Sequence, residues 1–71
     1  MKRRDLVEKI AAQAKRSGAK WEFMREGANH TVYVLNGVMI PVPRHNELGE
    51  ELAVDTFKEC QDALGKGWWR K

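Results

Sequence analysis

The spacing of apolar residues predicts a helix at the start of the chain. From about residue 2 to 17 they recur at intervals of three and four, as on the buried face of an amphipathic helix: Leu6, Val7, Ile10, Ala11 and Ala14. Asp5 lies in the first turn and Lys15 and Arg16 lie in the last, where each charge interacts favourably with the helix dipole. Gly18 follows directly and suits the left-handed position that ends a helix.

The middle of the chain changes to the alternating pattern of β-strands. Three runs rich in β-branched and aromatic residues predict strands over residues 21–25, 30–35 and 38–40. Asn36-Gly37 lies between the last two runs and is the strongest short signal for a hairpin, so these strands should pair antiparallel. Pro41 and Pro43 have no backbone N–H, so the third strand should lie at a sheet edge or end there.

Helical spacing returns over about residues 47–64. The residues expected on its buried face are Leu52, Ala53, Phe57, Cys60, Ala63 and Leu64. Two helices are the only elements available to cover one face of a three-stranded sheet. The sequence therefore predicts an α+β fold of order α-β-β-β-α, with a three-stranded antiparallel sheet covered by two helices. This is the layout of the double-stranded-RNA-binding-domain fold.

The C-terminal tail, residues 66–71, is basic and contains tryptophan. We expect it to lie outside the core elements. Adjacent exposed tryptophans are uncommon, so Trp68 and Trp69 should dock on RNA, on a partner protein or back over the helices.

Composition limits the class of protein. Seventy-one residues suffice for one small domain. Thirteen basic and ten acidic residues give a net charge of +3, which fits a nucleic acid or an acidic protein partner but also suits many soluble proteins. A single cysteine cannot form an internal disulfide, no apolar run reaches the roughly 20 residues of a membrane helix, and the basic start lacks the apolar segment of a signal peptide. We therefore expect a cytoplasmic protein that does not contact a membrane.

Three stretches of the sequence together resemble one protein family. They are residues 1–7 (Met-Lys-Arg-Arg-Asp-Leu-Val), 25–33 (Arg-Glu-Gly-Ala-Asn-His-Thr-Val-Tyr) and 40–48 (Ile-Pro-Val-Pro-Arg-His-Asn-Glu-Leu). Their order and spacing, over residues 2–64, are similar to those of the HicA (YcfA-like) toxins of bacterial toxin–antitoxin systems. The resemblance implies an mRNA interferase domain over residues 1–65, followed by the tail.

The resemblance assigns the catalytic role to His30. In the family the catalytic histidine begins the second strand, in a Gly-x-x-His pattern followed closely by an aromatic residue, and Gly27, His30 and Tyr33 match this pattern. His45 lies in a Pro-x-His segment that also resembles the family and is carried over as an RNA contact. The resemblance further implies mRNA as the target, arrest of translation as the outcome and a HicB-like antitoxin as the protein partner.

The chemistry of RNA cleavage fits these residues. RNA is cut when a 2′-hydroxyl attacks the adjacent phosphate, and an enzyme assists by moving protons and stabilising negative charge. Histidine has an ordinary pKa of about 6.5, so His30 suits the role of general acid or base. Guanidinium groups match phosphate oxygens with two donors. The residues expected to contact RNA are Lys2, Arg3, Arg4, Arg25, Arg44 and His45. The reaction requires no metal or cofactor, and none is expected.

The sequence leaves the orientation of several side chains open. His30, Val32 and Val34 share one face of their strand, so His30 would point inward if that face packed on the helices. Trp21 and Phe23 are suited to stacking on bases, but core packing is the favoured interpretation.

Two other functions compete with the enzyme hypothesis. The same fold binds double-stranded RNA by shape and phosphate contacts, without chemistry. Against this, the last helix opens with the acidic run Gly-Glu-Glu-Leu-Ala-Val-Asp at residues 49–55, where many members of the family have a more basic one. The other alternative is a degenerate toxin that only binds its partner, and a buried His30 would favour it.

Overall fold

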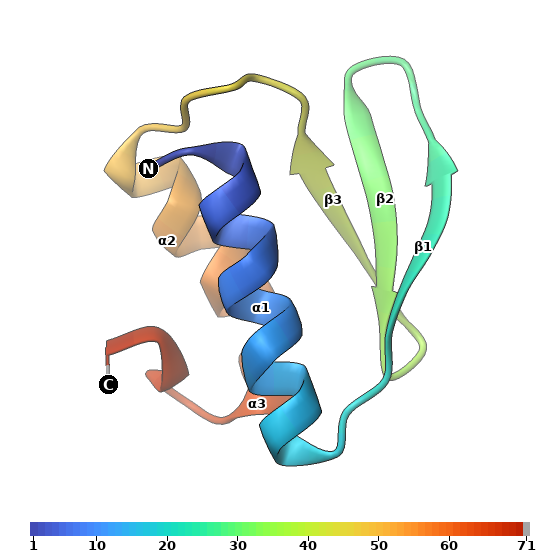
Figure 1. Cartoon of the computed structure of the whole chain (residues 1–71), viewed down its shortest axis with the longest axis vertical. Coiled ribbons are helices and arrows are strands. Elements are labelled where there is room, and N and C mark those ends of the chain that lie inside the picture. The colour runs from blue at the N-terminus through green and yellow to red at the C-terminus, as the bar shows by residue number, and fades with distance from the viewer. Residues whose placement is uncertain (71) are drawn as a thin grey trace.

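Two layers make up the structure, a three-stranded antiparallel sheet and the helices that cover one of its faces (Figure 1). The computed structural model describes residues 1–70. Its elements are α1 (Arg3–Ser17), β1 (Trp21–Glu26), β2 (His30–Leu35), β3 (Val38–Pro43), α2 (Glu50–Glu59), α3 (Gln61–Leu64) and the 3-10 turn η1 (Trp68–Arg70). The α+β fold predicted from the sequence, with its order of helix, three strands and helical end, is confirmed. Across residues 1–70, no helix is both long enough and apolar enough to cross a membrane.

Helix α1 buries the face that its spacing predicts. Leu6, Ile10 and Ala14 are buried in the core, and Val7 packs partly buried against it. Gly18 follows with φ 71°, and its backbone N–H donates to carbonyls of the last turn. This is the left-handed cap that the sequence predicts, at a position where a side chain would be strained.

The sheet has strand order β1-β2-β3. Asn36 and Gly37 connect β2 to β3 with φ 49° and 85°, the positive angles of a two-residue hairpin turn. Strand β3 lies at an edge, as its prolines predict, but it continues through Pro41 to Pro43 instead of ending near Ile40. It can do so because an edge strand pairs on one side only, so proline nitrogens that face away from β2 cost no ladder bond.

Burial and strand pairing together show which face of the sheet the helices cover. Tyr33 and Leu35 of β2, with Ile40 and Val42 of β3, pack in or against the core beneath the helices. Strand alternation therefore puts His30 on the opposite, open face, and His30 is exposed. The inward orientation considered from the sequence does not occur.

The helical end of the chain differs from the single helix predicted over residues 47–64. Helix α2 begins at Glu50, and Cys60 separates it from the short α3 because the Cys60 N–H donates to Phe57 O, three residues back. Leu52, expected in the core, is 40% exposed. Thr56 is buried in this part of α2 because its hydroxyl is satisfied by a hydrogen bond to Leu52 O, 3.0 Å away.

Trp68 folds back over the helices and joins the core. It is 4% exposed and packs edge-on against Phe57, with ring centroids 5.1 Å apart. Its indole N–H donates to Phe57 O at 3.0 Å, which satisfies a carbonyl near the end of α2. The expectation that the tail lies outside the core is wrong for Trp68, and folding back over the helices is the outcome observed.

Phe23 is not a core residue, contrary to expectation. Trp21 stacks on Tyr33 with centroids 4.5 Å apart and is partly buried, whereas Phe23 is 60% exposed. Phe23 pairs with Tyr33 ahead of the register shift in β1, and its ring lies edge-on to the Tyr33 ring with centroids 6.2 Å apart, so it shares the face of Tyr33. It remains exposed because β1 is the other edge strand, with no strand on its outer side.

Candidate functional site

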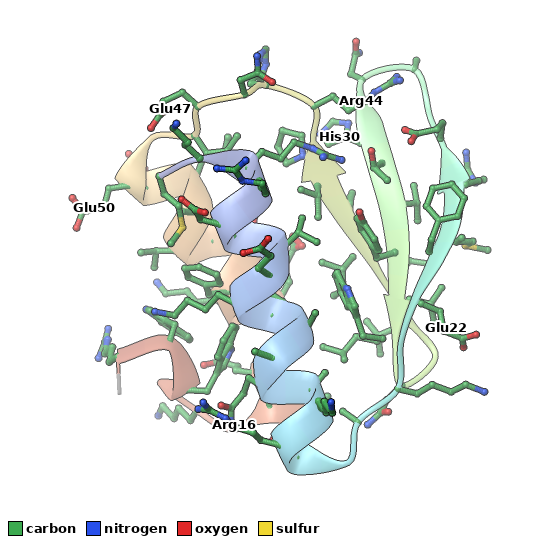
Figure 2. All side chains as sticks on the ribbon, viewed as in Figure 1. Arg16, Glu22, His30, Arg44, Glu47 and Glu50 are labelled. Carbon is green, nitrogen blue, oxygen red and sulfur yellow. The ribbon has the colours of Figure 1, made fainter. Side chains whose placement is uncertain are left out.

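His30 is the first residue of β2 (Figure 2). It lies at the end of the sheet that also holds the β1–β2 turn and the last residue of β3. Its carbonyl accepts a hydrogen bond from the Gly27 N–H at 2.7 Å, and on the other side it pairs with Pro43. The backbone of His30 is therefore held by the β1–β2 turn on one side and by β3 on the other, while its side chain remains exposed.

Gly27 has a steric reason to be glycine. A Cβ at this position would lie 3.1 Å from His30 O, closer than ordinary contacts allow. The tight approach lets the Gly27 N–H reach the His30 carbonyl. The Gly-x-x-His spacing of the sequence thus corresponds to a close turn that presents His30.

Arg44 binds the β1–β2 turn. Its Nη2 donates to Gly27 O and Ala28 O, and its Nη1 lies 3.6 Å from Glu26 Oε1. The Arg44 backbone N–H also donates to Asn29 O at 3.3 Å. The guanidinium expected to clamp phosphate is therefore used to fix the loop that carries His30.

Arg3, in α1, links the helix to β2 and β3 beside this turn. Its Nε donates to Pro43 O at 3.1 Å and its Nη2 to Thr31 Oγ1 at 2.6 Å. The Thr31 hydroxyl in turn donates to Glu26 Oε1 at 2.9 Å. One chain of contacts, Arg3–Thr31–Glu26–Arg44, thus ties α1 to the sheet around His30, and we call it the turn network.

Thr31 and Glu26, which form the middle of the turn network, were not predicted from the sequence. They face each other in the β1–β2 pairing, and Thr31 is 2% exposed. The sequence carries no signal for this role, because only the assembled sheet shows that Thr31 faces the core, where a buried hydroxyl requires partners.

Replacing Thr31 by valine should lower the free energy of unfolding by about 1–3 kcal/mol, because it leaves Arg3 and Glu26 without their shared partner. Urea unfolding followed by circular dichroism measures the loss. Thr56→Val is the matched control, since the Thr56 hydroxyl bonds only to its own helix and its removal should cost less. Equal losses in the two variants would contradict the stabilising role of the turn network.

The remaining predicted RNA contacts lie around this end of the sheet. Arg25 pairs with Val32 in the sheet. Its guanidinium lies beside the β1–β2 turn, because a Cβ added to Gly27 would be 3.8 Å from Arg25 Nη1. Lys2 and Arg4 line a shallow groove with Arg3, Asn46 and Glu47. His45 is exposed in the segment between β3 and α2.

The N-terminus is attached beside this groove. The Met1 amino group lies 3.2 Å from Glu47 Oε1 and donates to Leu48 O, and the Arg3 N–H donates to Asn46 O. These contacts place the basic start of α1 next to the segment that carries His45.

Charge is unevenly distributed along the chain. Residues 1–20 carry seven basic and two acidic side chains, whereas residues 47–62 carry six acidic and one basic. Burial, together with the neighbouring Asp55 carboxylate, raises the pKa of Glu59. The basic side of the molecule therefore lies along α1, and the acidic side along α2 and α3.

Cys60 is unsuited to be a nucleophile. It is 1% exposed, and burial followed by the Glu59 charge raises the pKa of its thiol to about 12. The reactive form of cysteine is the thiolate, which such a pKa excludes near neutrality. Within residues 1–70, no three side chains of the metal-binding types are grouped to hold an ion.

No protein-family model matches the chain, and no curated protein or solved structure compared with it does so either. The resemblance to the HicA family remains a prediction from the three stretches of sequence.

Proposed function

We propose that the protein is an endoribonuclease toxin that cleaves mRNA and arrests translation, with His30 as general acid or base. The observation that supports this most is the placement of His30. Its side chain is exposed on the open face of the sheet, on a backbone held by Gly27 and Pro43, and Arg25 shares that face through its pairing with Val32. A histidine needed only for packing would not require such a presentation.

The reaction needs two proton transfers. As the 2′-oxygen forms a bond to phosphorus, its proton leaves, and as the bond to the 5′-oxygen breaks, that oxygen gains a proton. The products are a 2′,3′-cyclic phosphate and a 5′-hydroxyl. An imidazole titrates near neutral pH, so His30 can perform one of these transfers without a metal.

The arginines divide between positioning and phosphate binding. Arg3 and Arg44 hold the β1–β2 turn through the turn network. Arg25 takes part in none of the ion pairs found among residues 1–70, so its guanidinium is available for the charge that develops on phosphate. Lys2 and Arg4 would bind the flanking backbone.

A HicB-like antitoxin that covers this end of the sheet is the proposed protein partner, in the cytoplasm. An acidic antitoxin would approach the basic start of α1 quickly, because opposite surface potentials steer the encounter of two proteins. A partner that also covers the open face at this end of the sheet would exclude RNA from His30.

Binding of duplex RNA without cleavage is the less favoured alternative. Helix α2 opens with Glu50 and Glu51 in its first turn, and Glu50 lies at the same end of the molecule as His30 (Figure 2). Carboxylates at that helix start repel the phosphates that such a binding module has to contact.

The test is cleavage of a single-stranded RNA by the purified protein in the presence of a metal chelator. We expect fragments that end in 2′,3′-cyclic phosphate and begin with 5′-hydroxyl. Intact RNA, or cleavage that the chelator abolishes, would refute the proposed chemistry.

A further inference from the structure

The C-terminal turn and α1 form a second basic groove, away from His30. Its lining residues are Lys9, Ala12, Gln13, Arg16 and Trp68, its volume is about 370 Å³, and we call it the tail groove. Arg16 lies at the lower end of α1 in Figure 2, whereas His30 and Arg44 lie at the upper end of the molecule.

The lining of the tail groove has the chemistry of an anion site. It contains an ammonium, a guanidinium and an amide, and no carboxylate. Neither Lys9 nor Arg16 takes part in an ion pair within the described residues, 1–70. Lys9 Nζ lies 5.9 Å above the Phe57 ring, which keeps its charge at the groove.

The tail adds aromatic surface and further positive charge. Trp69 is partly exposed and stacks on Phe57, and the Arg70 guanidinium lies 5.4 Å from the centre of the Trp69 ring. Lys66 is exposed in the same segment. Cationic side chains gathered along a groove form a typical surface for the backbone of a single-stranded nucleic acid, since the phosphates bind the cations.

We propose that the tail groove binds the backbone of single-stranded RNA, as a second contact, at the other end of the molecule, for a strand that is also bound at His30. This inference rests on the proposed function for the identity of the strand. Helix α1 has 15 residues and is about 22 Å long, so an RNA that reaches both sites must exceed a few nucleotides. The substrate would then be an extended single strand and not a dinucleotide step alone.

The test measures RNA affinity against salt concentration. All proteins carry His30→Ala, so that the RNA should not be cleaved during the measurement. They are titrated onto a labelled single-stranded RNA of about 12 nucleotides, a length within the usual site sizes of proteins that bind single strands. The groove variant adds Lys9→Gln and Arg16→Gln. The matched control adds Lys20→Gln and Lys58→Gln, which remove the same charge from residues outside the groove. Circular dichroism checks that each variant is folded.

The groove variant should bind about tenfold more weakly near 0.15 M salt, because two phosphate contacts each contribute about 0.7 to the slope of log affinity against log salt. Its slope should fall by about 1.4, and that of the control should stay unchanged. Equal losses in the two variants, or none in either, would overturn the proposal. So would a labelled poly-glutamate peptide that binds the groove as tightly as the RNA.

Failure of this proposal can be distinguished from failure of the proposed function. A chain with native His30 that leaves RNA intact, combined with weaker binding by the groove variant alone, refutes the nuclease and supports the groove. Cleavage by the native chain, combined with equal binding by groove and control variants, supports the nuclease and refutes the groove.

Discussion

Replacing Trp68 by alanine should lower the free energy of unfolding by about 3–5 kcal/mol, the usual loss for a buried tryptophan. The side chain is 4% exposed, contacts the Phe57 ring and donates its indole N–H to Phe57 O. Small domains have a total stability of only about 5–15 kcal/mol. The variant should therefore lose a large share of its stability.

Two further variants separate the causes of this loss. Trp68→Phe keeps a ring but removes the indole donor, and should cost about 1 kcal/mol for the hydrogen bond in addition to the lost volume. Trp69→Ala removes a partly exposed ring and should cost less than Trp68→Ala. Urea unfolding followed by circular dichroism measures all three. A Trp68→Ala protein as stable as the parent chain would contradict the placement of Trp68 in the core.

His30→Ala should reduce the rate of RNA cleavage by about 10²- to 10⁴-fold, the usual contribution of a general acid or base. Stability should change little, because the side chain is exposed and its backbone contacts do not involve the imidazole. Initial rates on a labelled single-stranded RNA, measured with purified proteins at matched concentrations, give the effect.

His45→Ala is the control for this effect. His45 is exposed in the segment between β3 and α2, and its loss should weaken RNA binding without removing a proton transfer. If the His45 variant loses the large factor and the His30 variant does not, the assignment of the catalytic histidine is wrong.

The secondary structure could be predicted because its signals are local. Apolar spacing in α1, the Asn36-Gly37 turn and the prolines of β3 each specify a nearby backbone geometry. The orientation of His30 could not be predicted, since alternation identifies two faces of a strand without indicating which one the helices cover. The pairing of β2 with its neighbours decides this.

The errors concern contacts between distant parts of the chain. Phe23 belongs to an edge strand with a bulge, and Trp68 folds onto a ring eleven residues earlier, in α2. Aromatic character predicted burial for Phe23, and the position of Trp68 beyond the last helix placed it outside the core elements. The adjacent tryptophans indicated docking, but only the assembled structure selects folding back over the helices from the three alternatives.

The sequence predicted which residues lie near His30, but not the turn network that connects them. Arg3 and Arg44 were expected to bind phosphate, but their guanidinium groups hold Thr31, Glu26 and the β1–β2 turn. This positioning role depends on residues up to 40 positions apart in sequence, such as Arg3 and Pro43. Only the assembled sheet brings them together.

The most direct test of the central claim is growth and RNA integrity after induction of the chain in bacteria, beside a His30→Ala variant shown to be folded. We expect growth arrest and cleaved mRNA with the native chain, and normal growth with intact RNA in the variant. Arrest and cleavage by both chains, or by neither, would contradict the claim that His30 makes this protein a ribonuclease toxin.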